Sequence, residues 1–122
     1  MSDILKKYNL TFATKDVNDE KVSILDSTNK VFTPIVNVCL EFEDPLEIQN
    51  YINGINRTIS GADPYNVFLL ITCIRVGHIT TQIFKRRPGE FVDFDHPILE
   101  IPSKDFADIL TEWRAFLLQP IA

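Results

Sequence analysis

Two amphipathic helical patterns constrain the fold of this 122-residue chain more than any other feature. In each pattern, large apolar residues recur at i, i+3, i+4, i+7 and i+11, which places them along one face of an α-helix. The first set is Ile48, Tyr51, Ile52, Ile55 and Ile59, and the second is Phe106, Ile109, Leu110, Trp113 and Leu117. Because each stripe must be buried, we expect both helices to pack on a shared core.

Start and stop signals support both helices. Asp44 is a favourable N-cap and Pro45 fits the first helical position, while Ser103 is expected to cap the second helix. Pro120 is expected to end the second helix, since proline cannot continue it. Gly54 weakens the first helix by about 1 kcal/mol relative to alanine. The predicted helices therefore span about residues 44–59 and 103–117.

Strand patterns occupy much of the remaining chain. Residues 2–8 fit one short helix, and residues 10–16 and 21–27 flank a turn-rich segment, as in a hairpin. A further strand is expected at residues 36–42, where Val36, Val38, Leu40 and Phe42 alternate with more polar residues.

The segment from residue 66 to residue 86 is ambiguous. Valine, isoleucine and threonine dominate it, and these residues pack well on a pleated surface. We therefore expect two strands, 66–75 and 79–86, that turn near Gly77. A long buried helix is the alternative, and it would reduce the sheet from six strands to four.

These elements predict one α+β domain over residues 1–122, with a single antiparallel sheet of about five or six strands and both amphipathic helices on one face. Each half of the chain reads as β-β-β-α, and the two helix stripes match at an offset of 58 residues. Duplication and chance similarity both explain this match.

Composition and charge narrow the function classes. The net charge of −5 is spread over both halves of the chain, so the surface repels phosphate backbones and a basic protein is a better partner than nucleic acid. Cys39 and Cys73 lie in apolar runs, as buried reduced thiols do. The first ten residues lack a signal-peptide pattern, and no apolar run fits a membrane span. We expect a cytoplasmic protein with no membrane partner.

The stretch FVDFDH, residues 91–96, groups two aspartates with a histidine. On a strand, Asp93 and Asp95 would lie on one face and His96 on the other, so these side chains would not converge on a metal ion. With Glu90 they would form an acidic stripe for a basic partner, or else a simple solvated face. Glu41 and Glu43 form a weaker second acidic set.

Motifs for catalysis are missing from the sequence. His78 and His96 are the two histidines, and neither lies beside a nucleophile motif. Zinc-ligand spacing and phosphate-binding glycine loops do not occur either. We therefore expect no catalytic residue, no metal and no cofactor. Lys85, Arg86 and Arg87 form the one basic cluster, at a turn.

The segment FVDFDHPILEIPSKDFADILTEWRAFLLQ, residues 91–119, resembles the end of small bacterial toxin-immunity proteins. The resemblance implies a non-enzymatic inhibitor that neutralises a basic toxin, such as a nuclease, through an acidic surface. Two alternatives remain: a small acidic secretion chaperone, which dimerises, and a sheet-based nucleic-acid binder that uses phenylalanines and the basic cluster. The oligomeric state, monomer or homodimer, stays open.

Overall fold

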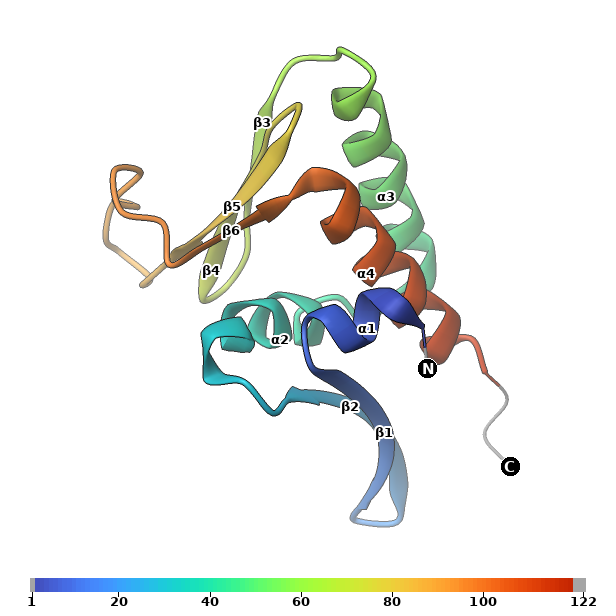
Figure 1. Ribbon diagram of the computed structural model, residues 1–122. Helices are drawn as coiled ribbons and strands as arrows, with labels where there is room; N and C mark the ends of the chain where they lie inside the picture. Colours follow the sequence, from blue (N-terminus) through green and yellow to red (C-terminus); the bar gives the residue numbers. More distant parts are fainter. Residues whose placement is uncertain (1, 120–122) are drawn as a thin grey trace.

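The computed structural model describes residues 2–119, which form an α+β fold with two antiparallel sheets (Figure 1). The helices are α1 (Asp3–Lys7), α2 (Thr33–Leu40), α3 (Pro45–Ile59) and α4 (Ser103–Leu117), and a 3-10 turn spans Lys30–Phe32. The strands are β1 (Leu10–Val17), β2 (Glu20–Ser27), β3 (Tyr65–Phe68), β4 (Thr72–Val76), β5 (Thr80–Lys85) and β6 (Leu99–Pro102). The prediction of an α+β fold with antiparallel strands is confirmed.

The prediction of a single sheet is wrong. Strands β1 and β2 form a separate hairpin, and the larger sheet has the order β3-β4-β5-β6. The strand expected at residues 36–42 is replaced by α2, which begins at Thr33 and has Pro34 in its first turn. Without that strand, no strand among residues 2–119 pairs with both the hairpin and the four-stranded sheet.

The alternation that misled the prediction is compatible with a helix. In α2 the buried residues are Ile35, Val36, Val38 and Cys39, which lie on one helical face. Val36 and Val38 fit both the two-residue period of a strand and the 3.6-residue period of a helix, so a short apolar run did not distinguish strand from helix. The first half of the chain therefore reads α-β-β-α-α, and the proposed β-β-β-α repeat is wrong.

In residues 66–86 the hairpin interpretation is correct and the long helix is excluded. The expected strand 66–75 is interrupted, however, because β3 ends at Phe68 and β4 begins at Thr72. All neighbouring strands of the larger sheet pair antiparallel, with Phe68 opposite Cys73 and Cys73 opposite Phe84. The additional turn, residues 69–71, lies at one end of the sheet.

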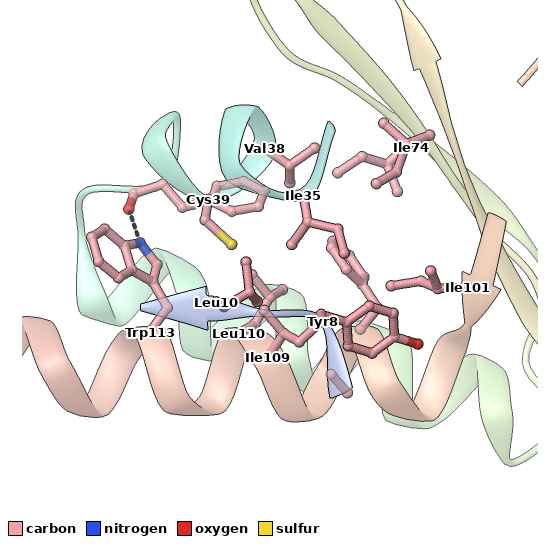
Figure 2. Close-up of a cluster of buried hydrophobic side chains, with 14 of the residues drawn as sticks. Tyr8, Leu10, Ile35, Val38, Cys39, Ile74, Ile101, Ile109, Leu110 and Trp113 are labelled. Carbon is pink, nitrogen blue, oxygen red and sulfur yellow. Dashed lines mark hydrogen bonds between the residues drawn. The ribbon is translucent and has the colours of Figure 1, made fainter. Parts of the chain in front are cut away.

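Helices α3 and α4 lie on the same side of the four-stranded sheet, as the sequence predicted (Figure 1). Figure 2 shows how one core joins both sheets: α2 lies above α4, β1 runs between them, and the larger sheet closes the side. Leu10, Ile35, Ile74 and Ile109 are among the residues in this cluster with almost no exposed surface. Cys39 and Cys73 are buried and free, as expected.

The two helix starts differ from each other. The Asp44 side chain caps α3 and accepts a hydrogen bond from the Leu46 N–H at 3.0 Å, as predicted. The prediction that Ser103 caps α4 is wrong, because Ser103 is the buried first residue of the helix and Pro102 occupies the cap position. The Ser103 hydroxyl instead donates to the Gly77 carbonyl at 2.7 Å. Pro120, the predicted stop signal, lies outside the described residues.

A buried hydrogen bond connects α4 to the segment between α2 and α3. The indole N–H of Trp113 donates to the Phe42 carbonyl at 2.9 Å (Figure 2). On its other side Trp113 meets the hairpin, since the ring of Phe12 lies 5.3 Å away in an edge-on arrangement. Trp113 therefore links three parts of the chain that are distant in sequence.

Substituting Trp113 tests this link. Trp113→Phe should lower the free energy of unfolding by about 1–3 kcal/mol, because it leaves the buried Phe42 carbonyl without a donor. The measurement is urea denaturation followed by circular dichroism. Phe116→Leu, on the same helix, keeps the hydrogen bond and should cost less. An unchanged midpoint for Trp113→Phe would contradict the role of this bond.

Candidate functional site

Residues 86–98 form a loop, and the strand predicted at residues 91–96 is absent. The loop follows β5 and folds against the outer face of the four-stranded sheet, which is the face turned away from α3 and α4 (Figure 1). The ring of Phe94 lies 5.1 Å from Phe84 and 6.5 Å from Phe68, and the Arg75 guanidinium stacks 4.2 Å above Phe94. Phe94 thus attaches the loop to the sheet, as does the Ile98 N–H, which donates to the Ile83 carbonyl of β5 at 2.8 Å.

The predicted separation of Asp93 from His96 is also wrong. A strand would place these side chains on opposite faces, but the loop turns and brings His96 Nδ1 within 2.8 Å of Asp93 Oδ2. The other carboxylate oxygen of Asp93 accepts from the Asp95 N–H at 3.1 Å. These hydrogen bonds lower the pKa of Asp93, and the Asp93 carboxylate raises the pKa of His96.

The three acidic residues predicted for partner binding are all exposed on this loop. Glu90, Asp93 and Asp95 surround Phe91 in sequence, and the Phe91 side chain is fully exposed. Within residues 2–119, no group of three or more histidine, cysteine or acidic side chains is arranged to hold a metal ion. The loop therefore presents carboxylates and one free aromatic ring.

Sequence reasoning missed a second exposed feature, the turn between β3 and β4. Phe68 is 55% exposed, Leu70 70% and Ile71 47%, so three large apolar side chains gather at one end of the sheet. We call Phe68, Leu70 and Ile71 the apolar tip. It lies beside the loop, because Phe94 contacts Phe68.

Glu41 holds the apolar tip in place. One oxygen of its carboxylate accepts from the N–H groups of Leu70, at 2.6 Å, and Ile71, at 3.2 Å. The other oxygen accepts from the Thr72 hydroxyl at 2.9 Å. Both oxygens of Glu41 are thus bonded within the chain, so this residue positions the tip. Glu43 is exposed and lines a cavity of about 360 Å³ with Lys21 and Trp113.

Arg86 completes the polar bonding of the same turn. Its guanidinium donates to the Leu69 carbonyl, and its N–H donates to the Ile71 carbonyl at 3.0 Å. The guanidinium also lies 5.6 Å from the centre of the Phe68 ring. Glu41 and Arg86 therefore bond the N–H groups of Leu70 and Ile71 and the carbonyls of Leu69 and Ile71, while the apolar side chains of the tip face solvent.

The outer face of the sheet offers little room for stacking nucleic-acid bases. Phe84 is buried beneath Phe94, and Arg75 covers Phe94. Among the rings of Phe68, Phe84 and Phe94, that of Phe68 alone is more than half exposed. Outside the sheet, the adjoining loop adds the fully exposed ring of Phe91.

Comparison with models of protein families, with curated proteins and with solved structures finds no significant match. Within residues 2–119, none of the helices has the length and apolar character needed to cross a bilayer.

Substituting Glu41 tests its role in the apolar tip. In Glu41→Gln one acceptor oxygen becomes an amide nitrogen, so at least one donor of the turn loses its partner. Amide exchange of Leu70 and Ile71 should become roughly tenfold faster, which corresponds to the loss of one hydrogen bond. Glu43→Gln is the matched control and should leave these rates unchanged. Equal rates in Glu41→Gln and the wild type would contradict the assignment.

Substituting Asp93 tests the folded loop. Asp93→Asn should lower the pKa of His96 toward its ordinary value of 6.5, because the hydrogen bond and the negative charge of Asp93 both favour the protonated ring. The measurement is an NMR titration of the His96 ring protons, with His78 as the internal reference. An unchanged His96 pKa would show that the loop does not hold this contact in solution.

Proposed function

We propose that this chain is a non-enzymatic protein-binding domain, an inhibitor of immunity type, that docks through the apolar tip and the loop 86–98. One observation carries the proposal: a turn with three exposed apolar side chains whose main chain is bonded by Glu41 and Arg86. Contiguous apolar patches on a protein surface mark interaction sites.

The hydrogen bonds that Glu41 and Arg86 make to the turn reduce the desolvation that opposes docking. Polar groups that enter an interface without partners oppose binding, because they lose their water. At this turn Glu41 and Arg86 already supply those partners, so Leu70 and Ile71 enter a partner's pocket with little polar desolvation. A few well-buried side chains provide most of the binding energy in protein interfaces, and removing the apolar surface of Leu70 and Ile71 from water favours binding. Phe91 adds an aromatic side chain, a type enriched at interfaces.

The loop is held in shape before a partner arrives. Phe94 packs on the sheet, Arg75 stacks over Phe94, and Asp93 bonds to both Asp95 and His96. A loop that is already ordered loses less conformational entropy on binding, which increases affinity. The same contacts fix the direction in which the loop presents its carboxylates.

Charge then selects the partner. Glu90, Asp93 and Asp95 attract a basic surface and increase the rate of encounter, as in other electrostatically complementary complexes. Lys85, the last residue of β5, and Arg87, in the loop, would meet acidic groups at the rim of the interface. The partner that fits is a basic folded protein with an apolar pocket, such as a toxin domain.

The secretion chaperone is the main alternative within the binding class. It predicts a stable dimer and an extended client that wraps the surface, whereas an inhibitor binds a folded domain through one patch. Light scattering of the purified protein, alone and with its partner, distinguishes these two assemblies.

The experiment has two stages. The tagged protein is first used to capture partners from its source cells, and the captured protein is identified and purified. Calorimetry with the purified partner then compares the wild type with Leu70→Asp and with Ile79→Asp. Ile79 is the matched control, because it is 82% exposed at the opposite end of the sheet, in the β4–β5 turn.

Leu70→Asp should weaken binding by at least about thirtyfold, the loss expected of an interface hot spot. Ile79→Asp should bind like the wild type. Replacing Asp93 and Asp95 together by lysine should slow association and reduce its dependence on salt. Equal affinity of Leu70→Asp and the wild type, for every purified partner, would refute this assignment.

A further inference from the structure

A groove runs along one face of α3, far in sequence from the loop 86–98. Its volume is about 520 Å³, and it is lined by Glu47, Asn50, Tyr51, Gly54, Arg57, Thr58, Ala62, Asp63 and Tyr65. The residues from α3 recur from position 47 to position 58, which corresponds to about 16 Å along the helix axis. The groove is therefore elongated, and a strand of about five residues matches its length.

Gly54 shapes this groove. A β-carbon at position 54 would lie 2.8 Å from the Tyr65 hydroxyl oxygen, so glycine allows the Tyr65 side chain to lie against α3. No positive backbone angle requires glycine here, since Gly61 and Gly89 are the glycines of the described chain with positive φ. A glycine that weakens the helix by about 1 kcal/mol is thus explained by the packing of Tyr65.

The groove reaches a free sheet edge. Tyr65, which lines the groove, is the first residue of β3, and β3 is an outer strand of the sheet. The Leu69 N–H donates to the Thr72 carbonyl at 2.9 Å, so residues 69 and 72 are a hydrogen-bonded pair. Such pairs alternate along an antiparallel ladder. Asn66 and Phe68 therefore direct their N–H and C=O groups away from β4.

We propose that this edge and groove bind an extended peptide, which adds to the sheet as a strand beside β3. The main chain of the peptide pairs with Asn66 and Phe68, and its alternate side chains enter the groove along α3.

The lining indicates the chemistry of the peptide. Glu47 and Asp63 provide two carboxylates against the single guanidinium of Arg57, so a lysine or arginine side chain in the peptide is favoured. The phenols of Tyr51 and Tyr65 stay protonated, because burial raises the pKa of each. They are available as hydrogen-bond donors and as apolar walls. This site goes beyond the proposed function; it shares Phe68 with the apolar tip but uses the main chain of that residue rather than its side chain.

The test starts from a library of random eight-residue peptides displayed on phage and selected on the wild-type protein. The most enriched sequence is synthesised, and its affinity is measured by fluorescence anisotropy. We expect an enriched lysine- or arginine-containing peptide that slows the amide exchange of Asn66 and Phe68. Failure to enrich any sequence would overturn the proposal, as would an enriched peptide that leaves both amides unprotected.

Two matched variants at one position separate main-chain pairing from side-chain contact. Asn66→Pro removes the outward N–H and no bond of the β3–β4 ladder, whereas Asn66→Ala keeps the N–H and removes the side chain. Asn66→Pro should weaken the peptide roughly three- to tenfold, while Asn66→Ala should bind like the wild type. Equal binding by Asn66→Pro and Asn66→Ala would overturn strand addition.

Gly54→Ala provides an independent variant that keeps the helix intact. Its methyl group displaces Tyr65 into the groove, so peptide binding should fall at least about threefold, while helix propensity favours the folded state. Thermal unfolding of each variant confirms that it is folded.

Amide exchange of the protein without peptide tests for self-association at the same edge. If the amides of Asn66 and Phe68 are protected from exchange without peptide, and more so at higher protein concentration, a second copy of the chain occupies the edge and the peptide proposal is wrong.

Discussion

The burial of α4 against both sheets is the constraint on which the rest of the structure depends. The hairpin β1–β2 and the four-stranded sheet share no strand, and one core formed with α2 and α4 joins them (Figure 2). Trp113 combines a hydrogen bond to Phe42 with ring contacts to Phe12, while Ile109 and Leu110 are fully buried. One helix face therefore fixes the position of every other layer.

This packing also explains the exposed features. With α3 and α4 covering the inner face, the sheet places its outer face and its ends in solvent, where the loop 86–98 attaches through Phe94. Helix α2 ends at Leu40, and the next residue, Glu41, reaches the β3–β4 turn. The helix that replaced the expected strand thus supplies the carboxylate that orders the apolar tip.

The sequence predicted the elements in which the spacing of apolar residues is regular over many residues, or in which two strand-like runs flank a clear turn. Helices α3 and α4 and the first hairpin were found because their apolar residues recur over 15 residues or flank a clear turn. Helix α2 was missed, since its eight residues are too few to separate the two periods. The strand expected at 91–96 was wrong, because the chain folds back there and packs the ring of Phe94 onto Phe84 of the sheet.

The candidate site was predicted only in part, for a similar reason. The carboxylates of Glu90, Asp93 and Asp95 were expected at the surface, and they lie there. The roles of Glu41 and Arg86 depend on partners 29 and 17 residues away, which no local pattern specifies. An exposed Leu70 between other apolar residues reads as core in the sequence, because periodicity does not indicate where a strand ends.

Rigidity of the apolar tip and loop in the free protein is the central claim, and backbone NMR relaxation tests it most directly. The account predicts order parameters of about 0.85 for residues 69–71 and 92–96, equal to those of the sheet, since Glu41, Arg86 and Phe94 hold both segments. Values below about 0.6 in either segment would contradict a preformed binding surface.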